Sequence, residues 1–177
     1  MQELLDWTIR TIRNDDIISS SLEEKKYNWV PLASVVVNKI INHNYSVIIV
    51  TDTKREWFSE YIINKINANT TRPFLPFYDF KNYTKMIDSN SVSSIKDILH
   101  HSFGNEFLIW YIGASNHIRA LLPKTTKNSF MWITDEEIQN CFYIPEDAKS
   151  DIKLLELYRL FDKTLEAVMF SEVEVEE

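Results

Sequence analysis

The sequence predicts an α/β fold with three layers, in which a five-stranded, mostly parallel sheet lies between helices and follows two leading N-terminal helices. Two observations predict this fold. Short β-branched and aromatic runs alternate with amphipathic helical patterns, which is typical of a parallel sheet joined by right-handed crossovers. In addition, no linker or repeat interrupts the chain, so residues 1–170 are expected to form one domain.

The leading helices are predicted from their apolar spacing and capping residues. Residues 1–13 place their large apolar side chains on one helical face. Ser20 and Glu23 have capping-box spacing for a second helix. Pro31 interrupts that helix, so a kink or restart is expected at Trp29 and Val30.

The strands are predicted where apolar runs are short and rich in β-branched or aromatic residues. Pro73 and Pro76 place the second of these runs at an edge of the sheet. Capping-box spacings at Thr53/Glu56 and Thr134/Glu137 predict a helix that extends to Asn67 and one further helical turn. The predicted strands are 45–50, 74–78, 107–112, 129–133 and 140–144.

The remaining elements lie in the middle and at the end of the chain. Residues 81–105 are polar and irregular, with one short helix expected at 92–101. Another helix is expected to follow the turn 113–116 and to end at Leu122. A last helix is predicted from 145 to 170, and the acidic tail 171–177 is expected to be solvated and mobile.

Composition excludes several classes of function. The net charge of −7 argues against direct nucleic-acid binding, which requires a basic surface. The single cysteine, Cys141, rules out an internal disulfide framework and is expected to be a buried structural thiol. The amphipathic start does not resemble a signal peptide, and no apolar run is long enough to span a membrane. A cytoplasmic protein is therefore expected.

The chain has only two glycines, Gly104 and Gly113. Nucleotide-binding α/β folds depend on Gly-rich turns after their strands, so no cofactor is expected. The turn 113–116 is the best anion-binding candidate because it follows a strand and precedes a helix. Thr51, Ser115 and Asn116 are candidates for a vestigial anion site. The ordinary alternative is that Ser115 or Asn116 simply caps the following helix.

The sequence contains few patterns that indicate a catalytic or metal site. Asp52 has the position of a base or metal ligand, but a cap between strand and helix is the ordinary interpretation. His117 and Arg119 would complete a phosphate site, although a lone histidine there is usually a surface residue. No metal-ligand spacing occurs, and no GxSxG motif supports a triad of Ser115, His117 and Asp52. We therefore assign no catalytic residue and no metal ligand.

Aromatic and apolar side chains point instead to protein partners. Trp7 and Trp29 on the leading helices are candidates for an oligomer interface, since tryptophan is enriched at interfaces. Met169 and Phe170 end the last helix beside the acidic tail, with Leu165 one turn earlier. These residues are candidates for partner binding. The alternative is that the pair closes the core.

Four segments carry a resemblance to a known family. DWTIRTIR, WVPLASV (Trp29–Val35), VIIVTDTKREWFSEYI (Val47–Ile62) and RPFLPFYDF (Arg72–Phe80) are similar to HobA proteins, the DnaA-associated replication initiation regulators of Helicobacter and Campylobacter relatives. The resemblance covers essentially the whole chain, and TDxKRxWFxEYI is its most specific part. It implies a DiaA-like fold of the phosphosugar-isomerase (SIS) type and a homotetramer built as a dimer of dimers.

The resemblance also implies a function. HobA proteins are non-enzymatic adaptors that bind the N-terminal domain of the initiator DnaA and promote its assembly at the chromosomal origin. The rival hypothesis is a phosphosugar-binding or isomerising enzyme of the SIS type. Such enzymes carry glycine- and serine-rich loops, of which the turns at 51–53 and 113–116 keep at most a trace.

Overall fold

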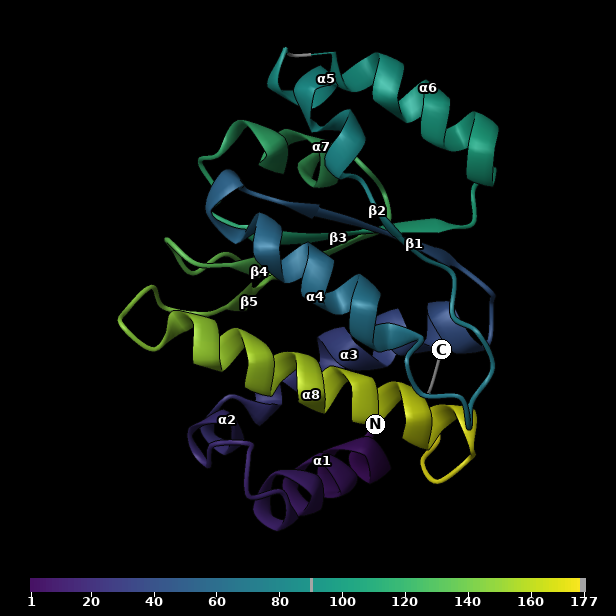
Figure 1. The fold of residues 1–177 in the computed structure, drawn as a ribbon. Coiled ribbons are helices and arrows are strands. Elements are labelled where there is room, and N and C mark those ends of the chain that lie inside the picture. Colours follow the sequence, from purple (N-terminus) through teal and green to yellow (C-terminus); the bar gives the residue numbers. More distant parts are fainter. Residues whose placement is uncertain (90, 176–177) are drawn as a thin grey trace. The chain divides into compact units, whose positions relative to one another are not determined.

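The computed structural model describes residues 1–89 and 91–175, and it divides the chain into two compact units. The helical unit comprises Met1–His43 and Glu146–Glu177, and the sheet unit comprises Asn44–Pro145. The elements of both units are labelled in Figure 1. Among the described residues, no helix has both the length and the apolar character needed to cross a bilayer.

The sheet unit contains a five-stranded parallel sheet, as predicted from the sequence, and the structure adds its strand order, β2-β1-β3-β4-β5. Strand β2 lies at an edge, as Pro73 and Pro76 indicated. The strands are β1 (Ser46–Thr51), β2 (Phe77–Asp79), β3 (Phe107–Gly113), β4 (Ser129–Ile133) and β5 (Phe142–Tyr143).

Helices cover both faces of this sheet (Figure 1). Helices α5 (Thr84–Asp88), α6 (Val92–Phe103) and α7 (Leu121–Lys124) pack with one face, where Ile95 and Tyr111 share a buried apolar cluster. Helix α4 (Glu56–Ile66) covers the other, where the rings of Phe58 and Trp132 lie 6.3 Å apart. Strand β3 is buried along its whole length, which explains its continuous apolar sequence.

The helical unit consists of α1 (Gln2–Asn14), α2 (Ser21–Glu24), α3 (Lys26–Ile41) and α8 (Ser150–Met169). Helices α1, α3 and α8 pack against one another. Trp29 of α3 is 1% exposed and meets the Phe161 ring of α8 edge to face, with centroids 6.3 Å apart. Trp29 is therefore a core residue of this unit.

Pro31 lies inside α3, which runs from Lys26 to Ile41 without interruption, so the expected restart at Trp29 and Val30 was wrong. Helix α3 begins at Lys26, and Lys25 separates it from the short helix α2. A proline inside a helix removes one backbone hydrogen bond. Burial of Trp29, Val30 and other residues of α3 offsets that loss.

The predicted capping boxes at Ser20/Glu23 and Thr134/Glu137 did not form, and carboxylates in both segments pair with more distant residues. Ser20 makes no side-chain cap bond, and Glu23 instead accepts a hydrogen bond from Arg13 Nη2 at 2.6 Å. Residues 134–136 form bends rather than a helical turn. There, Asp135 and Glu136 accept hydrogen bonds from Ser115.

Two further boundaries differ from prediction. Residues 81–105 contain α5 in addition to the expected helix, because Ile87 supplies a buried anchor. The last predicted strand shrinks to Phe142–Tyr143, and α8 begins at Ser150 rather than at Pro145.

The segment after α8 folds back as a helix cap. Ser171 has a positive φ of 57°, and its N–H donates to the Val168 carbonyl at 3.1 Å, while the Glu172 N–H donates to the Ala167 carbonyl at 2.8 Å. Val173 is 1% exposed, so the expectation of a wholly solvated tail was wrong. Residues 176–177 lie outside the described residues.

Candidate functional site

Three loops meet at the carboxyl end of the sheet, where ligands bind in open α/β folds. They follow β1, β3 and β4, which are neighbours in the sheet. Thr51 and Ser115 are buried there, whereas Asn116 is exposed. The structure therefore places all three candidates for the anion site at this end.

The backbone donors of the turn after β3 are occupied by carboxylates of the same chain. The Ala114 N–H donates to Asp52 Oδ2 at 2.9 Å, and the Ser115 N–H donates to Asp135 Oδ1 at 2.7 Å. The Asn116 N–H donates to Asp135 Oδ2 at 3.3 Å. Successive N–H groups of this kind cradle phosphate in other proteins. Here, aspartate side chains take the place of the anion.

Ser115 is held from several directions. Its hydroxyl lies 3.1 Å from Asp135 Oδ2 and also donates to Glu136, and its carbonyl accepts from Lys124 Nζ at 2.8 Å. Partial burial alone would raise the pKa of Asp135, but hydrogen bonds from Ser115 and Asn116 hold that pKa below its ordinary value. Asp135 is therefore a charged acceptor at neutral pH.

Asp52 forms a buried ion pair with Arg55 and also caps the 3₁₀ helix η1 (Thr53–Arg55) through the Arg55 N–H at 3.0 Å. This confirms the capping interpretation of Asp52. A Cβ at Gly113 would lie 2.7 Å from Asp52 Oδ2, so glycine is required for the close approach. Burial, and next the charge of Asp52, raise the pKa of Tyr111, whose hydroxyl donates to the Ala114 carbonyl at 2.7 Å.

Arg119 is also committed to internal partners. It is buried and pairs in bidentate fashion with Asp88 at 3.0 and 3.1 Å, and it donates to Glu56 Oε1 at 2.7 Å. This pairing with Arg119 lowers the pKa of Asp88. His117 Nδ1 accepts from the Arg119 N–H at 3.2 Å, so His117 caps the 3₁₀ helix η3 (Ile118–Ala120). The expectation that Ser115 or Asn116 is the cap was wrong.

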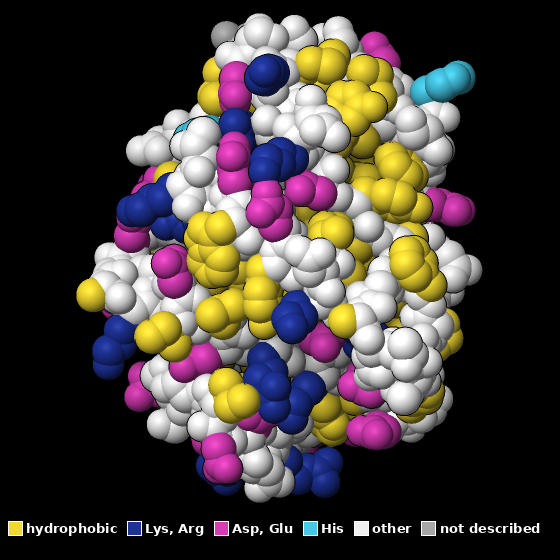
Figure 2. Space-filling model, viewed as in Figure 1, with side chains coloured by type: hydrophobic (Ala, Val, Ile, Leu, Met, Phe, Trp, Pro, Cys, Tyr) yellow, Lys and Arg dark blue, Asp and Glu magenta, His cyan; other side chains and the backbone are white. Residues whose placement is uncertain are grey.

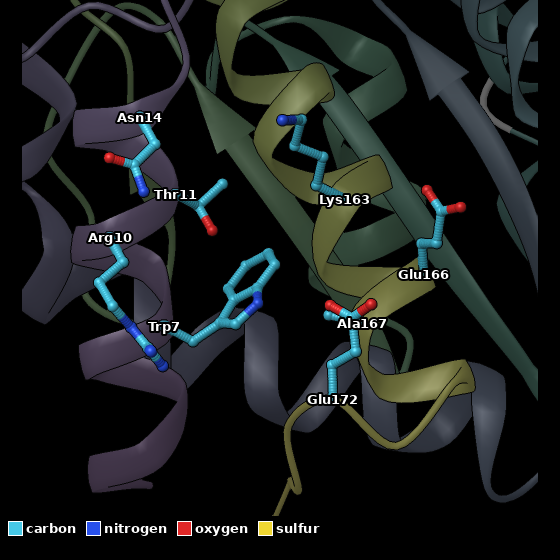
Figure 3. A pocket seen from close by; sticks show the side chains of 8 residues that line it. All are labelled: Trp7, Arg10, Thr11, Asn14, Lys163, Glu166, Ala167 and Glu172. Atoms are coloured by element: carbon cyan, nitrogen blue, oxygen red, sulfur yellow. The ribbon is translucent and has the colours of Figure 1, made fainter.

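A second candidate site lies in the helical unit, as a groove of about 570 Å³ between α1 and α8. Figure 3 shows the Trp7 ring projecting from α1 toward α8, with Glu172 beside Ala167. The groove is lined by Trp7, Arg10, Thr11, Asn14, Lys163, Glu166, Ala167 and Glu172.

Asp15 anchors the end of α1 to α8 beside this groove. Its Oδ2 lies 2.7 Å from both Arg159 Nε and Lys163 Nζ, and its Oδ1 accepts from the Ile17 N–H at 3.0 Å. Burial would raise the pKa of Asp15, but the hydrogen bonds from Lys163, Arg159 and Ile17 hold it well below its ordinary value.

The end of α8 presents the predicted partner-binding residues unequally. Phe170 is 49% exposed, Met169 is partly buried, and Leu165 is fully buried. Of the two tryptophans predicted at an interface, Trp7 is partly buried and lines the groove, whereas Trp29 is buried. The structure therefore offers Trp7 and Phe170 at the surface and keeps Leu165 and Trp29 inside.

Sequence reasoning missed the roles of Asp135, Glu136 and Arg55. The available signal was an acidic pair directly after β4, a strand adjacent to the one that carries the Ser115 turn. Cys141, expected to be buried, is only partly so, and burial raises its thiol pKa. Among the described residues, no group of three potential metal ligands occurs.

One face of the molecule carries charges of both signs. Figure 2 shows Lys and Arg side chains interspersed with Asp and Glu side chains on the face that it draws. This pattern differs from the continuous basic track that binds a phosphate backbone.

The fold and site together define an α/β protein of the parallel-sheet class whose ligand-binding end is filled by its own carboxylates. The family model described as HobA, DNA replication regulator, matches residues 1–175. The chain therefore belongs to the HobA family of DNA replication regulators. This confirms the family resemblance seen in the sequence.

Individual relatives agree with this assignment. The DNA replication regulator protein HobA of Helicobacter pylori is 25% identical over 98% of this chain and 99% of that protein. Among solved structures, a HobA–DnaA (domain I-II) complex from Helicobacter pylori matches with a TM-score of 0.70 and 24% identity, over 98% of this chain and 99% of that one. Helicobacter pylori HobA matches with a TM-score of 0.67 and 23% identity, over 96% and 97%.

Proposed function

We propose that this chain is a non-enzymatic adaptor that binds the N-terminal domain of the initiator DnaA in the cytoplasm and promotes its assembly at the chromosomal origin. Membership of a replication-regulator family supports this proposal, as does the similarity to a HobA chain solved with DnaA domains I-II. The absence of catalysis in this proposal is supported by one observation: Asp52 and Asp135 accept hydrogen bonds from the backbone N–H groups of the turn after β3, where a phosphate would bind.

The rival function, a phosphosugar-binding or isomerising enzyme, is disfavoured by the same geometry. A phosphate at the turn after β3 would have to displace Asp135 from the N–H groups of Ser115 and Asn116. The negative charge of the phosphate would also be repelled by the carboxylates of Asp52 and Glu136. The rival predicts that phosphosugars shift the amide resonances of Ser115 and Asn116 in NMR spectra, and the adaptor proposal predicts that they do not.

Assembly would depend on multivalency. We propose a homotetramer, in which four copies of the binding site raise the effective concentration of weakly bound DnaA, so that avidity gains about 10²–10⁴-fold without new contacts. Trp7 is the more suitable of the two predicted interface residues because its ring lines an open groove. Trp29 would act only by holding α3 against α8.

The partner-binding surface that we propose is the C-terminal end of α8. Phe170 is its exposed aromatic anchor, Met169 adds partly buried area, and Leu165 supports both from within. Glu166 and Glu172 lie on the adjoining groove wall and would steer a basic partner surface toward this end.

Helix α8 supplies a matched control for testing this surface. Ile152, in its first turn, is 55% exposed, compared with 49% for Phe170. We expect Phe170→Ala to weaken binding of the DnaA N-terminal domain by about tenfold or more, as for an interface anchor. Ile152→Ala should leave affinity unchanged. The measurement is biolayer interferometry with immobilised DnaA domain.

Either of two results would contradict the assignment of this surface. One is equal affinity of the Phe170→Ala and wild-type proteins. The other is an equal loss in both variants, which would indicate a general effect on α8. Circular dichroism of both variants establishes that the fold is intact.

A further inference from the structure

A second cavity in the sheet unit, of about 470 Å³, lies at the amino end of the sheet, away from the Ser115 turn. Tyr45 precedes β1, Phe107 begins β3 and Asn128 precedes β4, so the cavity spans the starts of three strands. Its volume is in the range of small-molecule sites. It is lined by Tyr45, Lys96, His100, Asn105, Phe107, Thr125, Thr126, Lys127 and Asn128.

The charge of this cavity is opposite to that of the chain. The chain carries a net charge of −7, yet the described residues that line the cavity include two lysines and a histidine and no Asp or Glu. Two lysines that converge on one hollow give a positive potential focused by the surrounding walls. Such a site favours an anionic ligand.

Two side chains of the cavity wall, Lys96 and His100, are oriented by contacts within the chain. Lys96 and His100 lie one turn apart on α6, and Lys96 Nζ donates to the Thr125 carbonyl. An ammonium group has three protons, so two remain for a ligand. The His100 ring is oriented by its Nδ1, 3.1 Å from the Gly104 carbonyl, and by an edge contact with Phe107 at 5.2 Å.

Other polar groups in the wall play a lesser part. The hydroxyls of Thr125 and Thr126 donate to carbonyls of α7, each with a contact at 2.7 Å, so their protons are already used. The donors available to an anion are therefore Lys96, Lys127 and the Asn105 amide. Phe107 is buried at the cavity wall and supplies an apolar surface for the organic part of a ligand.

We propose that this cavity binds a small organic phosphate, with Lys96 and Lys127 on the phosphate group and the Phe107 side of the cavity against the organic part. Lysine is a common phosphate ligand, and charge-assisted hydrogen bonds are the strong ones. The proposal is independent of the adaptor function, because it concerns neither the end of α8 nor the Ser115 turn.

The test is isothermal titration calorimetry of the full chain with AMP, inorganic phosphate and adenosine at constant ionic strength. AMP should give saturable heat and adenosine none. Lys127→Gln should weaken AMP binding by about tenfold. Lys65→Gln, an exposed lysine at the end of α4, is the matched control and should have no effect. NMR amide shifts should gather at residues 96, 105 and 127.

Several outcomes would overturn the proposal. They are the absence of saturable heat with AMP, equal binding by Lys127→Gln and Lys65→Gln, or amide shifts at Ser115 and Asn116 instead. Binding of a DNA duplex through Lys127 without AMP binding would assign the cavity to a nucleic-acid backbone and would also overturn it. Equal heats with AMP and inorganic phosphate would show that Phe107 contributes nothing to binding, and would contradict the proposed contact between Phe107 and the organic part of the ligand.

Discussion

The carboxyl end of the sheet and the groove between α1 and α8 differ in whether their polar groups are paired within the chain or line an open space. At the sheet, the backbone donors of the turn and the guanidinium of Arg119 meet carboxylates of the same chain. At the groove, an indole ring and several charged side chains line an open space of about 570 Å³. A ligand site can therefore keep its backbone geometry while side chains of the same chain occupy it. Partner recognition is better sought in the helical unit than at the carboxyl end of the sheet.

The largest expected effect comes from Asp52, which joins the two turns of the filled site. Asp52→Ala removes the acceptor of the Ala114 N–H and leaves the buried Arg55 guanidinium without this carboxylate. We expect a loss of about 3–5 kcal/mol in the free energy of unfolding. Urea denaturation at one protein concentration measures it.

Glu60 provides the control for Asp52. It belongs to an ion pair with Lys81 that is about half exposed on both sides. Surface pairs contribute little, so Glu60→Ala should leave the urea midpoint unchanged. Equal effects of the two substitutions would show that the Asp52 site is not specially dependent on its internal charge.

Gly113 tests how closely the filled site is packed. In Gly113→Ala, the new Cβ would meet Asp52 Oδ2 at 2.7 Å, and we expect a loss of about 3 kcal/mol. Gly104→Ala has open space around its Cβ, so its cost of about 1–2 kcal/mol comes only from the backbone, whose φ of +63° disfavours an L residue. If both cost the same, backbone conformation alone would explain Gly113.

Asp15 gives the smallest of the three effects, in the helical unit. Asp15→Asn removes the charge that binds Arg159 and Lys163, and we expect a loss of about 2 kcal/mol at neutral pH. The folded state lowers the pKa of Asp15, so its contribution is complete above the ordinary aspartate pKa of about 3.9 and is lost as the pH falls below that value.

The difference in stability between wild type and Asp15→Asn should therefore shrink as acid is added. Thermal unfolding of both proteins at a series of pH values measures it. A difference that stays constant to strongly acidic pH would mean that the Asp15 charge contributes nothing.

The sequence was sufficient to predict the sheet, for physical reasons that are local. Strand β3 is an unbroken apolar run because both of its faces are covered. Strand β2 lies at an edge, which agrees with the two prolines, Pro73 and Pro76, that precede it. Asn44, shortly after α3, adopts a positive φ of 56°, a conformation in which asparagine often replaces glycine.

The failures arose where distant residues compete for local groups. Thr134 and Glu137 have the spacing of a helix start, but Asp135 between them is recruited by the Ser115 turn, twenty positions away. Pro31 was expected to break α3, yet the burial of its neighbours outweighs one lost hydrogen bond. Neither effect is visible in a local window of sequence.

The position of the candidate site was predicted from the sequence, but its occupation by carboxylates of the same chain was not. Asp52, Ser115 and Thr51 do meet at one end of the sheet, because parallel strands bring their carboxyl ends together. Their hydrogen bonds also involve the carboxylates of Asp135 and Glu136, from the loop after β4. Two arginines complete the site, Arg55 in the loop after β1 and Arg119 in the loop after β3. Spacing within single segments carries no information about that pairing.

The most direct test of the adaptor proposal is light scattering coupled to size exclusion, on this chain alone and with the N-terminal domain of DnaA. We expect a mass four times the chain mass of 21.0 kDa for this chain alone, and a mass larger by whole DnaA domains for the mixture. A monomer, or an oligomer whose mass is unchanged by DnaA, would contradict it.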